Sequence, residues 1–81
     1  MNTDQILAEL TDIFRTVLDD ETLVLRPDTT AADVPGWDSM NHITIVVEAE
    51  QHFGIKVRTA EIEALRNVGD FVSLIAAKHA G

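Results

Sequence analysis

The chain has 81 residues, which is enough for one folded domain over residues 1–81 and too few for a second hydrophobic core. Its composition, 46% hydrophobic and 25% charged, is typical of a globular protein and excludes a disordered chain. Fourteen acidic residues against six basic ones give a net charge of −8, which disfavours nucleic acid and anionic membranes as partners and favours basic proteins.

Cysteine is absent, and His42, His52 and His79 are too scattered for a zinc motif, so no metal site is expected. The N-terminal segment lacks a basic stretch followed by a continuous apolar run, and no segment is long and apolar enough for a membrane span. We expect a cytoplasmic protein that does not insert into membranes, and a monomer.

The first predicted helix carries its apolar residues at the spacing of one buried helical face. Thr3 or Asp4 is expected to cap its start, and Asp19 and Asp20, which are unfavourable at the negative end of a helix, are expected to end it. The members of the apolar face are Ile6, Leu7, Leu10, Ile13, Phe14, Val17 and Leu18.

Residues 19–38 are predicted to form a long loop, because Pro27, Pro35 and Gly36 exclude a continuous helix. A connection of this length in a compact domain is usually functional or disordered. Its apolar residues indicate that it packs across the bundle; they are Leu23, Val24, Leu25 and Val34.

A second helix is predicted to begin at Asp38 or Ser39 and to end at Gly54, a residue suited to closing helices. The β-branched run at residues 43–47 resembles a strand when taken alone. The length of the segment and its two end signals nevertheless favour a helix. Its periodic positions are Met40, Ile43, Val46 or Val47, Glu50 and Phe53.

Two further helices are predicted near the C-terminus. Thr59 is expected to cap a short helix containing Ile62 and Leu65, and Asn67 a longer one that frays at Gly81. The longer helix carries Val68, Phe71, Val72 and Ile75. The predicted fold class is therefore all-α: a four-helix bundle of three longer helices and one short one, with a long loop between the first two.

Ser39 is the principal candidate for a functional residue. The segment Gly36–Met40 places its hydroxyl at the first turn of the second helix, after a turn that holds it at the surface. Free N–H groups and the positive end of the helix dipole stabilise a phosphate at such a position. Taken in isolation, however, an Asp-Ser pair usually does no more than cap a helix.

A catalytic serine–histidine pair is the first alternative, because His42 lies three residues after Ser39 and can share its face. The motif lacks the second glycine of a nucleophile elbow, no strand precedes it, and no carboxylate is placed to orient His42. We therefore expect no catalytic residue and interpret His42 as a surface residue that contacts partners or a group attached to Ser39.

The chain resembles the acyl carrier protein family over nearly all of its length. The resemblance rests on the apolar face of the first helix and on four segments: Leu25–Thr29, Gly36–Met40, Glu48–Val57 and Val68–Ile75. In that family an Asp-Ser-Leu or Asp-Ser-Met triplet opens the second helix of a four-helix bundle, and its serine carries 4′-phosphopantetheine. The resemblance implies a carrier and not an enzyme.

By position, the resemblance implies that Ser39 bears the phosphopantetheine arm, which coenzyme A donates and which carries acyl groups as thioesters. Asp38 would be the preceding acid, and Met40 the apolar residue that locks the start of the helix into the core. The implied partners are a phosphopantetheinyl transferase, an acyl-loading ligase or transferase, and pathway synthases with basic docking patches.

The segment between Pro27 and Ile55 contains acids but no lysine or arginine, which favours reversible docking of basic partners. An ordinary solvated acidic face is the other interpretation. These acids are Asp28, Asp33, Asp38, Glu48 and Glu50. The candidate partner surface consists of Asn41, His42, Glu48 and Glu50.

Housekeeping fatty-acid carriers are typically more acidic where this chain has Asn41, His42 and Thr44. This difference, with Trp37 before the triplet, makes the chain look more like the stand-alone carriers of secondary metabolism, special lipids or aminoacyl transfer than like a housekeeping carrier. The function expected from the resemblance is to carry acyl intermediates between enzymes of fatty-acid, special-lipid or polyketide-type biosynthesis. An aminoacyl or peptidyl carrier, of D-alanyl or nonribosomal-peptide type, is the alternative within carriers. From another class, the chain is a helical interaction domain, with or without phosphorylation of Ser39.

Two more interpretations stay open in the sequence. Trp37 either faces partners or covers the bundle. Four apolar residues are candidates for contacts with an acyl chain held between the second and third helices, although plain core packing is favoured because every small bundle needs such residues. These candidates are Met40, Val47, Ile62 and Leu65.

Overall fold

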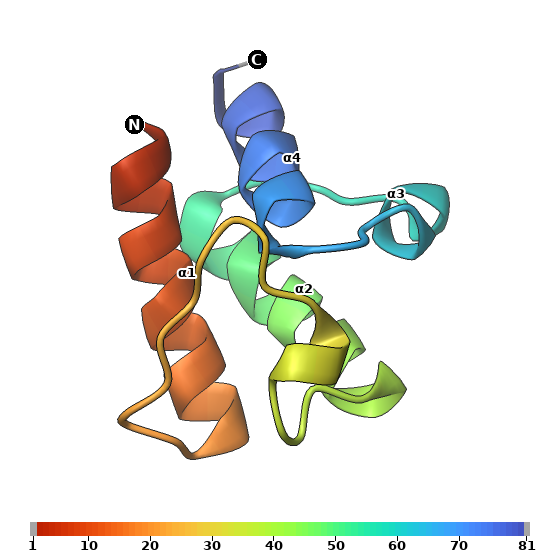
Figure 1. Ribbon diagram of the computed structural model, residues 1–81. Helices are drawn as coiled ribbons and strands as arrows, with labels where there is room; N and C mark the ends of the chain where they lie inside the picture. The colour runs from red at the N-terminus through yellow and green to blue at the C-terminus, as the bar shows by residue number, and fades with distance from the viewer. Residues whose placement is uncertain (1, 81) are drawn as a thin grey trace.

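The computed structural model describes residues 2–80, and over these residues the chain is helical without any strand (Figure 1). This confirms the predicted all-α class, with three longer helices, one short helix and a long first loop. The elements in chain order are α1 (Thr3–Leu18), the 3-10 helix η1 (Ala31–Asp33), α2 (Ser39–Phe53), α3 (Thr59–Glu63) and α4 (Val68–Ala80). None of them is long and apolar enough to cross a membrane.

The core lies where α1 packs against α2 and α4. Phe14 of α1 and Phe71 of α4 are both fully buried, and their rings meet edge-on with centroids 6.4 Å apart. The predicted faces of α1 and α4 are confirmed, because the buried residues of both helices fall within them. The remaining fully buried large side chains are Ile6, Leu10, Ile45, Val46, Val68 and Ile75.

The capping residue at the start of α1 differs from the prediction, whereas the end of the helix agrees with it. Asn2, and not Thr3 or Asp4, caps the start, because its side-chain oxygen accepts a hydrogen bond of 2.8 Å from the Gln5 amide. Asn2 is thus a better placed capping residue than the two that follow it. Asp19 closes the helix in the left-handed conformation, with φ of 52°, as the expected stop requires.

The end signals of α2 are confirmed. Asp38 caps the start by accepting a 2.9 Å hydrogen bond from the Asn41 amide, and Gly54 closes the helix with φ of 67°. The predicted apolar face is wrong at Met40 and Ile43, which are exposed, whereas Val46, the first of the two alternatives at its position, is buried. Apolar residues occupy more than one face of this helix, so that spacing alone does not show which face turns toward α1. The buried face consists of Ile45, Val46, Ala49 and Phe53.

The loop between α1 and α2 crosses the bundle, as predicted, and Figure 1 shows it passing between α1 and α4 before it reaches η1. Leu25 and Val34 are buried, whereas Val24, which we expected to pack, is 65% exposed. The amides of Val68 and Gly69 donate to the carbonyls of residues 29 and 27, at 2.9 and 2.7 Å. The loop is therefore fastened to the first turn of α4.

The two C-terminal helices form where expected, with one capping residue displaced. Arg58 precedes α3 and its amide donates to Glu61 at 2.9 Å, so Thr59 is the first helical residue and not the cap. Asn67 is confirmed as the cap of α4, because its side-chain oxygen accepts from the Asp70 amide at 2.8 Å. The expected fraying at Gly81 lies outside the described residues.

Candidate functional site

Ser39 is exposed and occupies the first position of α2, at the end of a sharp turn. Gly36 forms that turn with φ of 87°, a conformation that other residues rarely adopt. The side-chain amide of Asn41 donates to the Gly36 carbonyl at 2.7 Å, while Asp38 accepts from the Asn41 backbone. Asn41 and Asp38 thus fix the turn to the helix and hold the Ser39 hydroxyl at the surface.

The start of α2 provides amide groups for an anion. The Asn41 amide is bound by the Asp38 side chain, and the His42 amide donates to the Asp38 carbonyl at 2.8 Å. The hydrogen bonds within residues 2–80 do not use the amides of Ser39 and Met40. Two N–H groups at the positive end of a 15-residue helix are therefore available to a phosphate on the Ser39 oxygen.

Trp37 covers the bundle and is buried. Only 8% of it is exposed, and its ring stands edge-on against Phe14. Its indole N–H donates a 2.9 Å hydrogen bond to Nδ1 of His42, which is half-buried. Within the described chain, the hydrogen-bond partner of the His42 ring is thus Trp37.

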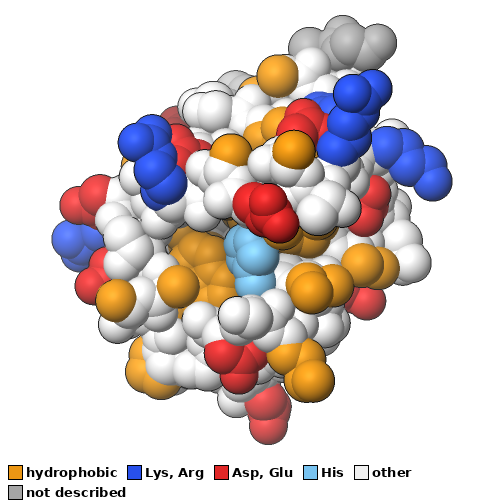
Figure 2. Space-filling view, turned by 90° about the vertical axis from the view of Figure 1, so that its right-hand side faces the viewer, with side chains coloured by type: hydrophobic (Ala, Val, Ile, Leu, Met, Phe, Trp, Pro, Cys, Tyr) orange, Lys and Arg blue, Asp and Glu red, His pale blue; other side chains and the backbone are white. Residues whose placement is uncertain are grey.

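An open groove of about 560 Å³ adjoins Ser39 between α2 and the segment around α3. Figure 2 shows this side of the molecule, with a histidine in a hollow flanked by hydrophobic side chains. The groove combines polar and apolar side chains. Its lining residues are Ala31, Trp37, Asp38, Ser39, His42, Ile43, Ile62, Glu63, Leu65 and Arg66.

The four candidate acyl-chain residues are not brought together. Ile62 and Leu65 line the groove beside Ser39, whereas Val47 lines a different hollow, together with Lys56. Met40 is 79% exposed, so the expectation that it locks α2 into the core is wrong. Sequence reasoning missed Ile43 as a groove residue, although its position four residues after Ser39 could have indicated a shared face.

The acidic candidates have different roles. Glu48 is exposed on α2. Glu50 is half-buried and accepts a 3.0 Å hydrogen bond from the Val57 amide, which ties α2 to the segment before α3. Asp33 accepts from the Thr30 amide at 3.0 Å and stabilises η1. Glu50 and Asp33 therefore serve to hold local structure, Glu50 at the C-terminal part of α2 and Asp33 at η1.

Two ion pairs stabilise the region of α3 and α4. Lys78 lies 2.7 Å from Glu61, and its hydrogen bond lowers the pKa of that carboxyl, with a further contribution from the Arg58 amide. Arg66 donates from both Nε and its amide to Asp70, which lowers the pKa of Asp70. Within residues 2–80, no three acidic, histidine or cysteine side chains are grouped closely enough to hold a metal ion.

Residues 8–75 match the protein family described as "Phosphopantetheine attachment site". The chain is 38% identical to the acyl carrier protein of Renibacterium salmoninarum, with 98% of both chains covered. It is 32% identical to that of Acidothermus cellulolyticus, over 94% of this chain and 90% of the relative. It is 31% identical to the meromycolate extension acyl carrier protein of Mycolicibacterium smegmatis, over 89% and 73%.

The fold is similar to the solution structure of the holo acyl carrier protein from Geobacter metallireducens. The TM-score is 0.87 and the sequence identity 43%, with 93% of this chain and 86% of that chain covered. The sequence comparisons and the structure comparison thus both find similarity to acyl carrier proteins.

Proposed function

The chain belongs to the acyl carrier protein family, whose members are carriers and not catalysts and have a phosphopantetheine prosthetic group, and from this premise we propose that Ser39 is the residue that bears the group. The supporting observation is the environment of Ser39. Ser39 is exposed at the first turn of α2, beside two available backbone amides and next to a groove of about 560 Å³. These residues fit an arm that begins with a phosphate.

The attachment step requires little from this chain. The Ser39 oxygen attacks the phosphorus of coenzyme A that bears pantetheine, a bond forms between them, and the pyrophosphate bond breaks to release adenosine 3′,5′-bisphosphate. The hydroxyl proton passes to a base of the transferase. Ser39 therefore needs accessibility and a fixed backbone, which Asp38 and Asn41 provide, and no catalytic neighbour.

We propose that the cargo is an acyl group, carried as a thioester between enzymes of fatty-acid, special-lipid or polyketide-type biosynthesis. The exposed acid Glu48 and the net charge of −8 favour synthases with basic docking patches. Asn41 is uncharged, which favours a specialised pathway over housekeeping synthesis. An aminoacyl or peptidyl cargo is the alternative, and loading assays with the respective ligases distinguish the two.

The attachment is tested by incubating the protein with coenzyme A and a broad-specificity phosphopantetheinyl transferase and measuring its intact mass. Ser39 and Ser73 are the two serines of the chain, and both are exposed, so Ser73→Ala is a matched control for Ser39→Ala. We expect one adduct on the wild type and on Ser73→Ala and none on Ser39→Ala. An adduct that persists in Ser39→Ala would contradict the proposal.

A further inference from the structure

His42 is held in one orientation and one tautomer by Trp37. An indole N–H can only donate, and Nε1 of Trp37 lies 2.9 Å from Nδ1 of His42. Nδ1 must therefore accept, so the neutral imidazole carries its proton on Nε2. The donor is itself fixed, because Trp37 is buried against Phe14.

The Nε2–H group of His42 is free to bind something else. The hydrogen bonds within residues 2–80 pair the ring with Trp37 alone. No buried side-chain nitrogen or oxygen of these residues lacks a partner, so Nε2, which has none, is accessible to solvent. Since His42 lines the groove that contains Ser39, the structure presents a defined donor there.

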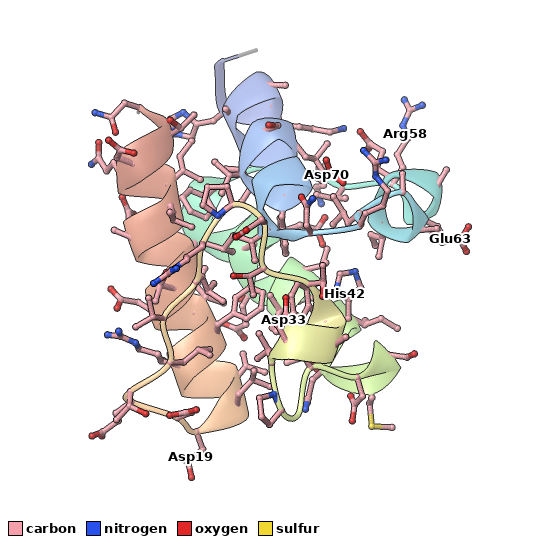
Figure 3. All side chains as sticks on the ribbon, in the orientation of Figure 1. Asp19, Asp33, His42, Arg58, Glu63 and Asp70 are labelled. Atoms are coloured by element: carbon pink, nitrogen blue, oxygen red, sulfur yellow. The ribbon has the colours of Figure 1, made fainter. Side chains whose placement is uncertain are left out.

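His42 lies three residues after Ser39 in α2, and both residues line the groove. Residues three apart on a helix are neighbours, with Cβ atoms about 5–6 Å apart, and helical side chains lean toward the N-terminus. Both effects direct the His42 ring toward the turn that begins at Ser39. Figure 3 shows His42 on the side of α2 that faces α3.

Other charged groups of the groove are differently engaged. Asp38 is bound to the Asn41 amide, and Arg66 of the segment before α4 donates to Asp70. Glu63 of α3 would repel a phosphate. The Nε2–H of His42 differs from the guanidinium of Arg66 in that a buried partner fixes its direction, whereas the Arg66 side chain is 83% exposed.

We propose that His42 Nε2–H donates a hydrogen bond to a phosphate oxygen of the phosphopantetheine group on Ser39, and that Trp37 is the positioning residue that fixes the required tautomer. The inference rests on the proposed function. It assigns to Trp37 and His42 a role in orienting the first atoms of the arm along the groove.

The test compares protein with and without the arm by NMR. We expect the ¹⁵N spectrum of the unmodified wild type to show the Nε2–H tautomer of His42. On attachment, the Nε2 proton is expected to move downfield and to exchange more slowly with water. In Trp37→Phe, which keeps a ring but lacks the donor, the unmodified protein is expected to show a mixture of tautomers.

The ³¹P signal of the modified protein gives an independent readout. A hydrogen bond to a phosphate oxygen changes the ³¹P chemical shift, so replacing the donor reports on this contact. At one fixed pH, we expect the ³¹P signal of modified His42→Gln to be displaced from that of the modified wild type. His79→Gln, in the last turn of α4, is the control and is expected to keep the wild-type ³¹P shift.

An Nδ1–H tautomer in the wild type, an unchanged Nε2 proton on attachment, or the same ³¹P shift in wild type and His42→Gln would overturn the inference. These results differ from a failure of the proposed function. In that case the mass measurement shows no adduct on Ser39, and both proposals are wrong. An adduct on Ser39 together with an unchanged ³¹P shift in His42→Gln contradicts the role of His42 alone.

Discussion

The indole ring of Trp37 stands almost perpendicular to the phenyl ring of Phe14, at an interplanar angle of 88° and with ring centroids 4.9 Å apart. Phe14 is fully buried in α1, so this contact joins the residues just before Ser39 to the centre of the core. The turn that presents Ser39 is therefore anchored by packing, in addition to the hydrogen bonds of Asp38 and Asn41.

Replacing Trp37 tests this anchoring. We expect Trp37→Ala to lower the free energy of unfolding by about 3–5 kcal/mol, because it leaves a cavity against Phe14. Trp37→Phe should cost less, about 1–3 kcal/mol, because an aromatic ring still packs against Phe14. The remaining cost arises because His42 loses its hydrogen-bond donor. Urea unfolding followed by circular dichroism measures both, because the chain has no second tryptophan for fluorescence. Equal losses in the two variants would contradict the packing role.

The exposure of Met40 leads to a second prediction. Met40→Ala is expected to change the free energy of unfolding by less than about 0.5 kcal/mol, as is usual for surface substitutions. Phe14→Ala, in the core, should cost about 3–5 kcal/mol. Thermal and urea unfolding of both variants give the comparison. A loss of several kcal/mol in Met40→Ala would mean that this residue packs in the core after all.

The sequence predicted the fold where one pattern dominates. The face of α1 is the single apolar stripe of that helix, and Asp38 and Gly54 mark both ends of α2. The orientation of α2 about its axis was not predictable from spacing, because its apolar residues cover more than one face. Neighbouring elements decided it: α1 packs on one side, and Met40 and Ile43 were left exposed.

In the candidate site, too, some features could be predicted from the sequence and others could not. Ser39 and Asp38 are local features, and their placement at the helix start followed from capping preferences. The contact between Trp37 and His42 depends on how the loop folds back over the start of α2. No periodic pattern encodes a hydrogen bond between an indole and an imidazole five residues apart.

Replacing Gly69 by alanine is expected to change the stability in the direction opposite to the usual one for a helical glycine. In an ordinary helix, replacing glycine by alanine stabilises the protein by about 0.5–1 kcal/mol. At Gly69, however, a Cβ would lie 2.8 Å from the Pro27 carbonyl oxygen, which is backbone of the loop. We therefore expect Gly69→Ala to destabilise the protein by about 1–3 kcal/mol.

Thermal unfolding of Gly69→Ala measures this effect. The Pro27 carbonyl accepts a 2.7 Å hydrogen bond from the Gly69 amide. A shift of the loop that relieved the clash would therefore also weaken this hydrogen bond. Ser73→Ala, at an exposed position of the same helix, is the control and should leave stability nearly unchanged. A stabilised Gly69→Ala variant would show that the loop does not approach α4 so closely.

The ion pair of Glu61 and Lys78 predicts part of the acid sensitivity. The hydrogen bond from Lys78 lowers the pKa of Glu61 below its usual 4.5. A carboxyl whose pKa is lower in the folded than in the unfolded state adds stability that is complete above its unfolded pKa. That stability is lost as the pH falls through the lower, folded pKa. Wild-type stability should therefore fall more steeply below about pH 4.5 than that of Glu61→Gln.

Melting temperatures measured from neutral pH down to the acid transition test the contribution of Glu61. Near neutral pH, Glu61→Gln is expected to melt below the wild type, because the neutral amide cannot replace the charged partner of Lys78. The two curves should approach each other as the pH falls, since protonated Glu61 has lost the same charge. Glu21→Gln, at an exposed position of the loop after α1, is the matched control. A constant difference between wild type and Glu61→Gln at every pH would show that the ion pair contributes nothing to acid unfolding.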